Sequence, residues 1–290
     1  MNYINLSDMK LSQIVLGTDG YGERIDKKTA FELMELYVKN GGNVLDTARM
    51  YTDGKSEKIV GEFAKSNRDN LYISTKCGFP YDRKNRLSEQ DIVFDVNTSL
   101  DTLNLEYIDI LWLHRDDTDI EVEYIIDTLN KLRRDGKVKY FGASNWSHDR
   151  IMQANAYAQR SNQYGFIASQ PHYNLASRSY VWDNTLTYLE GDELSKYLEQ
   201  PFPVFAFSAQ AKGFFEKYAQ GTLSPKAQER YFNEKTLKTY EKIIGLARKT
   251  GDSISYTALK MLIEQSPFDV FPIIGPSNTE QLKQTLNITA

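Results

Sequence analysis

The sequence has few of the residues that mark secreted, metal-binding or nucleic-acid-binding proteins. It has one cysteine in 290 residues, which excludes an intrachain disulfide framework and indicates a reducing, cytoplasmic location. Its three histidines lack ligand spacing, so we expect no metal site. The net charge is −4, without a basic stripe, and we therefore expect no nucleic-acid partner.

Long apolar runs are also missing. None approaches the roughly 18–20 residues of a membrane span, and the first residues lack the positive-then-apolar pattern of a secretory signal. We therefore expect no membrane association. The apolar share of 41% and the charged share of 26% are ordinary for a soluble globular protein. A chain of 290 residues is long enough for two domains or for one barrel.

What the chain does contain is a regular alternation of strand-like and helical segments. Eight runs rich in Val, Ile, Leu, Phe and Tyr lie at 14–16, 43–45, 71–74, 108–113, 138–141, 166–169, 204–207 and 270–274. Helical patterns between them cover 27–40, 57–66, 89–103, 122–134, 149–160 and 192–198. Because the composition shows no break, we predict one domain over residues 1–290, a closed (β/α)₈ TIM barrel.

Two additions to the repeating pattern are expected. Residues 1–13 form a short N-terminal hairpin that closes the barrel bottom. The connection between the seventh and eighth strands is enlarged and holds two helical patterns, at about 225–250 and 254–265.

Polar residues recur at the carboxyl ends of the predicted strands, where barrels of this type place their chemistry. Asp46, Lys76 and His114 end the second, third and fourth strands. The later strands end in Ser144, Asn145, Gln170, Ser208 and Gly275. We therefore predict a site built from the first three of these residues.

A nearby tyrosine makes this group a proton-donor site. A phenol has a pKa of about 10 and is a poor acid near neutrality, but a nearby cation lowers that pKa. Lys76 can supply the cation, Asp46 can hold it charged, and His114 can orient a carbonyl oxygen next to Tyr51. Singly, each has a structural interpretation: a helix cap for Asp46, a solvated lysine for Lys76, a buried core histidine for His114.

The surrounding residues resemble the aldo-keto reductase family. Residues 42–51 read GNVLDTARMY and are followed by Ser56, Glu57 and Gly61, which is similar to the family's G-x-x-x-D-T-A-x-x-Y…S-E…G signature. The segments ISTK at 73–76, LHRDD at 113–117 and KVKYFGASNW at 137–146 resemble its lysine, histidine and G-x-S-N strands. The resemblance spans residues 14–285 and implies an NAD(P)H-dependent carbonyl reductase.

The resemblance also implies a role for each site residue. Tyr51 is the general acid, Lys76 and Asp46 tune its pKa, and His114 orients the carbonyl. Asp46 also borders the cofactor. Residues implied to contact the nicotinamide half are Gly17, Thr18, Ser144, Asn145, Gln170 and Phe207. Residues implied to contact the pyrophosphate and adenosine are Ser208, Gln210, Gly275, Ser277, Glu280 and Gln281, with helix N-terminal amides suited to phosphate.

Two departures from the family pattern bear on the site. The loop between Tyr51 and Ser56 is two residues longer than in the usual Y-G-x-S-E form. Gln281 and Thr285 stand where the family commonly clamps the NADP 2′-phosphate with Arg and Asn, and Gln lacks the charged, bidentate grip of Arg. We expect NADP(H) from the resemblance, with NAD(H) as the alternative. The glycines at 17, 20 and 22 do not match a Rossmann motif.

Charged residues near the expected pocket favour a polar aldehyde, ketone or sugar-like substrate. Asp19 and Arg115 stand where family members with lipophilic substrates carry aromatic residues, although the two can instead pair with each other. Trp146 is a third candidate contact. Two other functions stay open: a Schiff-base enzyme using Lys76, and a non-enzymatic, nicotinamide-binding regulatory member of the fold.

Overall fold

The computed structural model describes residues 1–82 and 84–288 and confirms the closed parallel barrel. The strands follow the order β10-β3-β4-β5-β6-β7-β8-β9, so that β10 closes against β3. Their bounds are Val15–Gly17 (β3), Val44–Asp46 (β4), Tyr72–Cys77 (β5), Ile108–Leu113 (β6), Val138–Ser144 (β7), Ser169–Gln170 (β8), Val204–Ala206 (β9) and Val270–Ile274 (β10).

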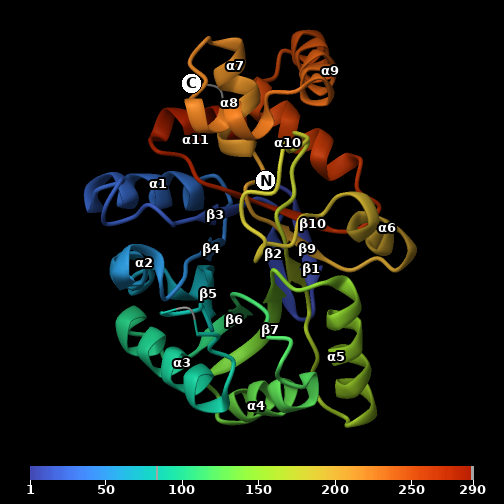
Figure 1. Ribbon diagram of the computed structural model, residues 1–290. Coiled ribbons are helices and arrows are strands. Elements are labelled where there is room, and N and C mark those ends of the chain that lie inside the picture. Colours follow the sequence, from blue (N-terminus) through green and yellow to red (C-terminus); the bar gives the residue numbers. More distant parts are fainter. Residues whose placement is uncertain (83, 289–290) are drawn as a thin grey trace.

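Helices surround these strands and cover the outside of the barrel (Figure 1). The helices that follow successive strands are α1 (Lys27–Lys39), α2 (Lys55–Ala64), α3 (Glu89–Leu103), α4 (Val122–Arg134), α5 (His148–Arg160), α6 (Gly191–Glu199), α10 (Ile254–Glu264) and α11 (Thr279–Leu286). In α4 the buried residues Val122, Ile125, Ile126, Leu129 and Leu132 recur every three or four positions. This spacing places one apolar face against the strands and the charged residues outside.

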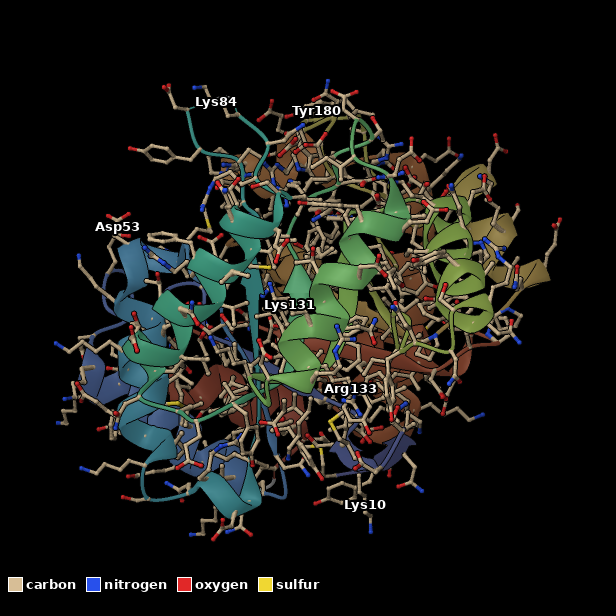
Figure 2. The ribbon with its side chains drawn as sticks, turned by 90° about the horizontal axis from the view of Figure 1, so that it is seen from below. Lys10, Asp53, Lys84, Lys131, Arg133 and Tyr180 are labelled. Atoms are coloured by element: carbon tan, nitrogen blue, oxygen red, sulfur yellow. The ribbon has the colours of Figure 1, made fainter. Side chains whose placement is uncertain are left out.

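The expected N-terminal hairpin is present and closes the barrel at the amino ends of the strands. Strands β1 (Tyr3–Leu6) and β2 (Met9–Ser12) pair antiparallel. Leu6, Met9 and Leu11 are buried in one cluster with barrel-interior residues such as Trp112 and Phe205. Figure 2 shows Lys10 of the hairpin at one end of the molecule and Lys84 and Tyr180 of the strand-to-helix loops at the other.

The enlarged connection between β9 and β10 is confirmed, but its helices differ from the expectation. The segment predicted as one helix over 225–250 forms α8 (Pro225–Tyr231) and α9 (Glu234–Thr250). Asn233 interrupts it: its side chain accepts a hydrogen bond from the Thr236 amide and caps α9. A further short helix, α7 (Phe214–Ala219), precedes them and was not predicted. These helices gather on one side of the barrel (Figure 1).

The sixth barrel strand is shorter and later than predicted. The expected run at 166–169 gives way to β8 at Ser169–Gln170, although the Ile167 amide still donates to the Phe141 carbonyl. A long segment without regular structure, residues 171–190, connects β8 to α6. It runs over the carboxyl ends of the strands, as shown by the bond from Arg115 Nε to Thr185 Oγ1.

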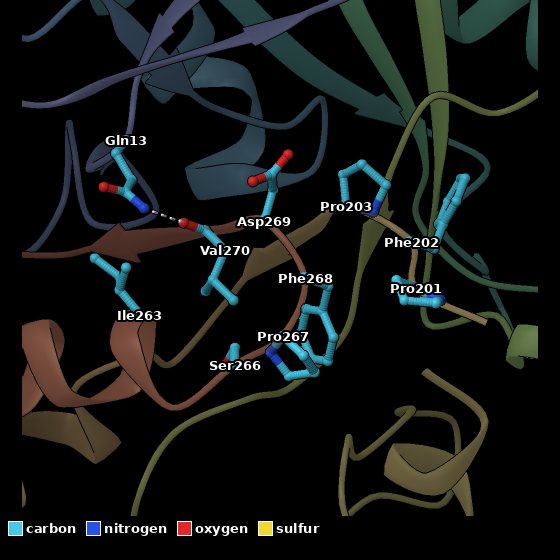
Figure 3. Close-up of a pocket in the computed structure, with 10 residues that line it drawn as sticks. All are labelled: Gln13, Pro201, Phe202, Pro203, Ile263, Ser266, Pro267, Phe268, Asp269 and Val270. Atoms are coloured by element: carbon cyan, nitrogen blue, oxygen red, sulfur yellow. Dashed lines mark hydrogen bonds between the residues drawn. The ribbon is translucent and has the colours of Figure 1, made fainter. Parts of the chain in front are cut away.

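A hollow of about 470 Å³ lies at the amino end of the barrel, away from these loops. Figure 3 shows its lining, which includes Gln13, Pro203 and Asp269 just before β3, β9 and β10. Its position opposite the strand carboxyl ends separates it from the predicted chemistry. Among the described residues, no helix combines the length and apolar character that crossing a membrane requires.

Candidate active site

Asp46 and Lys76 form a buried ion pair at the carboxyl ends of two neighbouring strands. Strands β4 and β5 pair with Asp46 opposite Ser74. Lys76 lies two residues further along β5 and on the same face of the sheet as Ser74. Lys76 Nζ lies 2.6 Å from Asp46 Oδ2 and donates to the Thr47 carbonyl at 2.7 Å. Burial opposes the charge on Lys76, but Asp46 and Tyr51 more than offset it, so the pKa of Lys76 lies above its usual value. Lys76 is therefore a fixed cation.

The Tyr51 ring lies over this cation. Lys76 Nζ is 4.8 Å from the ring centroid. Tyr51 begins a 3₁₀ turn, η1 (Tyr51–Gly54), in which Thr52, Asp53 and Gly54 all have positive φ, at 47°, 53° and 82°. Three successive left-handed residues are unusual, and strain of this kind persists only where surrounding contacts hold it. The lengthened loop after Tyr51 is thus a tight turn packed at the site.

Three main influences act on the pKa of the Tyr51 phenol, two upward and one downward. Burial raises its pKa, the Lys76 charge lowers it, and the Asp46 carboxylate raises it again; the net pKa is above the usual value. Lys76 does act to lower this pKa, as expected, but burial outweighs it, so the net pKa is not brought down. The phenol is protonated near neutral pH, which is the form a proton donor needs.

His114 lies next to Tyr51 as a neutral imidazole. The ring centroids are 6.0 Å apart in an edge-to-face arrangement. Burial, and then the charges of Lys76 and Arg115, hold the pKa of His114 well below its usual value. Within residues 1–82 and 84–288, His114 Nδ1 is buried without a hydrogen-bond partner. His114 Nε2 is not among these buried atoms and has no hydrogen-bond partner in the same residues, so it is the ring nitrogen that faces open space.

The polar residues ending β7 and β8 border the same centre. Gln170 Nε2 donates to Asp46 Oδ1 at 3.1 Å, which ties the sixth barrel strand to the ion pair. Ser144 Oγ donates to the Gln170 carbonyl, and Asn145 Nδ2 donates to the His114 carbonyl. Gln170 Oε1 has no hydrogen-bond donor in the described part of the chain. It is a suitable acceptor for a carboxamide N–H.

Gly17 and Thr18 at the end of β3 differ from Phe207 and Ser208 after β9 in burial and in the residues that they contact. A side chain at Gly17 would meet Ile273 at 2.8 Å, so this glycine permits β3 to pack against β10. Thr18 is fully buried, and its Oγ1 lies 2.8 Å from Ser56 Oγ. Phe207 is half-buried and meets His172 edge to face, while Ser208 has a φ of 56°.

The predicted adenosine-end residues lie at β10 and the start of α11. Gly275 is exposed, and a side chain built there meets only Asp19, at 4.0 Å. The Ser277 amide donates to Gln281 Oε1 at 2.8 Å, so the two predicted contacts are bonded to each other. Glu280 is exposed beside them. Gln210 Nε2 donates to Thr285 Oγ1 at 3.1 Å, which links the β9 loop to α11.

The three residues predicted to contact the substrate have different surroundings in the structure. Asp19 pairs with Arg24 at 2.8 Å, so the alternative Asp19–Arg115 pair does not form. Arg115 stays beside His114 and donates to its carbonyl. Trp146 is only 1% exposed and packs against Phe166 outside the barrel strands, which leaves its ring no open surface for a substrate.

Phe79 is a site residue that sequence reasoning missed. Its ring centroid is 5.0 Å from that of His114, and the Arg115 guanidinium carbon lies 5.3 Å over the same ring. Nothing local marked it, because it is one of 14 phenylalanines in a loop without periodicity. The loop is held in place by Asp95 of α3, which accepts from the Gly78 amide and from Arg86.

Comparison with known proteins agrees with this geometry. The profile of the aldo/keto reductase family matches residues 13–290. The chain belongs to this family. As a family member it is an NAD(P)-dependent oxidoreductase, and its relatives support NAD(P)H-dependent carbonyl reduction as the reaction class.

Three relatives of this aldo/keto reductase show the range of names in the family. Norsolorinic acid reductase B of Dothistroma septosporum is 29% identical over 98% of the chain and 76% of the relative. A probable voltage-gated potassium channel subunit beta of Oryza sativa subsp. japonica is 30% identical over 89% and 82%. Aryl-alcohol dehydrogenase [NADP(+)] of Phanerodontia chrysosporium is 26% identical over 96% and 78%.

Proposed function

We propose that this protein reduces the carbonyl of a polar aldehyde, ketone or sugar-like substrate, with Tyr51 as the general acid. The observation that carries the proposal is the Lys76–Asp46 ion pair directly beneath the Tyr51 ring, with the neutral His114 imidazole beside it. This arrangement supplies a protonated phenol, a fixed cation to stabilise the phenolate that forms, and a neutral ring nitrogen toward the carbonyl oxygen.

Each residue of the site then has one task. Bound nicotinamide supplies the hydride. Tyr51 gives its phenolic proton to the carbonyl oxygen. Lys76 stabilises the phenolate left behind, and Asp46 keeps Lys76 charged and aimed. His114, neutral because of burial and two neighbouring cations, orients the carbonyl through Nε2.

We propose cofactor contacts for the polar groups at the strand ends, which suit the parts of a nicotinamide dinucleotide. Gln170 Oε1 accepts from the nicotinamide carboxamide, supported by Ser144 and Asn145. The half-buried Phe207 ring offers an aromatic face to stack on the nicotinamide. Ser208 and Gln210 follow the pyrophosphate, and the open surface at Gly275 leaves room for adenosine. Gly17 and Thr18 are further proposed contacts of the nicotinamide half, and Ser277, Glu280 and Gln281 are further proposed contacts of the adenosine end.

NADP(H) is our first choice of cofactor, with NAD(H) as the alternative. The choice turns on Gln281 and Thr285, neither of which brings a positive charge to a 2′-phosphate. Titration of protein fluorescence with NADPH and NADH tests it directly. At least tenfold tighter binding of NADPH supports NADP(H), and equal or tighter binding of NADH supports the alternative.

The competing functions make different use of Lys76. A Schiff base needs a neutral amine, whereas Lys76 is held charged by Asp46 at 2.6 Å. Borohydride trapping of a substrate on Lys76 would overturn our assignment. A regulatory role without catalysis predicts nicotinamide binding without turnover, and relatives named as potassium channel subunits give it weak support.

The decisive experiment is Tyr51→Phe, assayed with NADPH and a carbonyl panel. We expect about a 10²-fold to 10⁴-fold loss of kcat because the ring remains and only the proton donor is removed. Unchanged binding of NADPH serves as the control for folding. Full activity in this variant would refute the mechanism, and a panel in which neutral aromatic aldehydes exceed every polar substrate would refute the substrate class.

We further propose that residues 1–290 act as one domain in the cytoplasm. The pairing of β10 with β3 joins the two ends of the chain in one barrel. The only cysteine, Cys77, is buried, and burial raises the pKa of its thiol, so it packs the barrel and is not reactive.

A further inference from the structure

Arg115 is a cation placed at the edge of the catalytic centre. It follows His114 in the chain, and its guanidinium lies over Phe79, whose ring also packs on the His114 imidazole. Its side chain is only 13% exposed. Burial lowers the pKa of Arg115, which shows that its charge is poorly solvated. A guanidinium in this position gains strongly from an anionic partner.

The protein provides hydrogen-bond acceptors for only some of the N–H groups of the Arg115 guanidinium. Nη1 donates to the His114 carbonyl at 2.8 Å, and Nε donates to Thr185 Oγ1 at 3.0 Å. Nη2 has no acceptor within hydrogen-bonding distance among the described residues; its nearest carboxylate oxygen, Asp183 Oδ2, is 3.9 Å away. Nη2 is nevertheless not one of the buried polar atoms that lack a partner in the described chain. It therefore faces open space.

Asp183 is a weak internal counter-ion. Its carboxylate is 39% exposed, and its other oxygen accepts from the amide and the hydroxyl of Thr185. The charges of Arg115 and Arg230 both act on Asp183, so two cations share one carboxylate at this edge of the site. The guanidinium edge therefore keeps room and charge for a second anion.

We propose that Arg115 selects carbonyl substrates that carry a carboxylate a few atoms from the carbonyl. The carboxylate binds the Nη2 edge while the carbonyl oxygen lies at Tyr51 and His114, because Phe79 brings the guanidinium and the imidazole against one ring. This inference rests on the proposed carbonyl reduction and narrows its substrate to oxo acids. Asp183 competes for the same N–H groups and limits the affinity.

The test compares two carboxylates, glyoxylate and 4-oxobutanoate, with their methyl esters. The two compounds place the carboxylate at two different distances from the carbonyl. The measured quantity is the ratio of kcat/KM for acid over ester with NADPH. We expect a ratio above one for the unaltered protein and at least a tenfold fall of that ratio in Arg115→Met. Because acid and ester share the same reaction centre, any effect of the substitution on His114 cancels in the ratio. Arg115→Lys, which keeps the charge but not the fork, is expected to fall between them.

Asp183→Asn gives an independent test that leaves Arg115 in place. The amide oxygen still accepts from Thr185, but the competing charge is gone, so we expect the acid-to-ester ratio to rise by threefold or more. Arg160→Gln removes an exposed cation from the end of α5 and controls for net charge; its ratio is expected to match the unaltered protein.

Three outcomes overturn the inference. Active protein that prefers the methyl ester of both compounds would do so, as would an acid-to-ester ratio that Arg115→Met leaves unchanged, or one that Asp183→Asn leaves unchanged. Failure of the unaltered protein to turn over any neutral or anionic carbonyl compound is a separate result, because it refutes the proposed function itself and this inference with it. Should Arg115→Met not fold, the Asp183→Asn comparison decides.

Discussion

At the scale of single residues, the chemistry depends on a balance around one phenol. Burial and Asp46 raise the pKa of Tyr51, and Lys76 lowers it. Burial outweighs the Lys76 charge and so keeps the tyrosine protonated near neutral pH. Carbonyl reduction needs the phenol, so we expect its rate to be flat through neutrality and to fall at alkaline pH. Alcohol oxidation needs the phenolate and is expected to rise with pH.

Replacing the ion pair with neutral residues tests this balance. The double variant Asp46→Asn with Lys76→Met avoids the unpaired buried charge that either single change would leave, which typically costs about 3–5 kcal/mol. Loss of the cation raises the pKa of Tyr51 further, so the rising limb of alcohol oxidation should move to higher pH and kcat should fall by about 10²-fold or more. A pH profile identical to that of the unaltered protein would show that the ion pair as a whole does not tune Tyr51.

At the scale of elements, the turn after Tyr51 holds the phenol. Thr52 Oγ1 donates to the Tyr21 carbonyl at 2.7 Å and accepts from the Ser56 amide at 3.1 Å. These bonds hold a β-branched residue at a φ of 47°, a conformation that costs of order 1–3 kcal/mol by itself. The hydroxyl therefore anchors both the strained turn and the start of α2.

Thr52→Val removes the hydroxyl at nearly constant shape. We expect kcat to fall by about tenfold or more with a smaller change in KM, because the turn relaxes and Tyr51 moves away from its working position. Thr52→Ser retains both bonds and is expected to stay within threefold of the unaltered protein. Thr98→Val, which removes an exposed hydroxyl bonded to the Phe94 carbonyl in α3, is the control. Equal kcat in Thr52→Val and Thr98→Val would contradict this role.

Elements with an uninterrupted apolar face were predicted well from the sequence. The α4 pattern placed its helix at 122–134, as found, because every third or fourth residue is buried against the barrel. The prediction over 225–250 was wrong because helical composition continues through Phe232 and Asn233, and only the bond from Asn233 to the distant Ser177 carbonyl shows that the chain turns there. A local pattern does not contain that contact.

At the scale of the whole molecule, the hairpin completes the barrel interior. Leu11 is fully buried, in one cluster with Val15, Phe205 and Phe271 from the barrel strands. Leu11→Ala removes a large part of this contact, and we expect the free energy of unfolding to fall by about 2–5 kcal/mol. Chemical denaturation measures it. Because the hairpin lies at the end opposite Tyr51, KM for the carbonyl substrate should stay within twofold.

A matched control is Tyr3→Ala in the same hairpin, where the side chain is 43% exposed. Its hydroxyl donates to the Gly41 carbonyl, so we expect about 1 kcal/mol of destabilisation, well below the effect at Leu11. Equal losses in the two variants would show that the hairpin does not share the barrel core.

The sequence by itself determined the barrel and the residues that meet in its centre. The carboxyl ends of neighbouring parallel strands lie together, so polar residues ending successive strands converge wherever the barrel closes. This is why Asp46, Lys76 and His114 were predicted to meet without coordinates, whereas Tyr51 was added through the resemblance of residues 42–51 to the family signature. The alternation of apolar runs and helical faces was enough to predict that closure.

Only the tertiary structure decided how the surrounding loops use their side chains. It paired Asp19 with Arg24, buried the Trp146 ring with its N–H bonded to the Arg115 carbonyl, and brought Thr185 and Phe79 to the Arg115 side chain. The physical reason is that a loop has no periodicity to orient its side chains. Their directions follow from contacts between distant segments, such as Arg115 with Thr185, 70 residues apart, and these exist only once the barrel has closed.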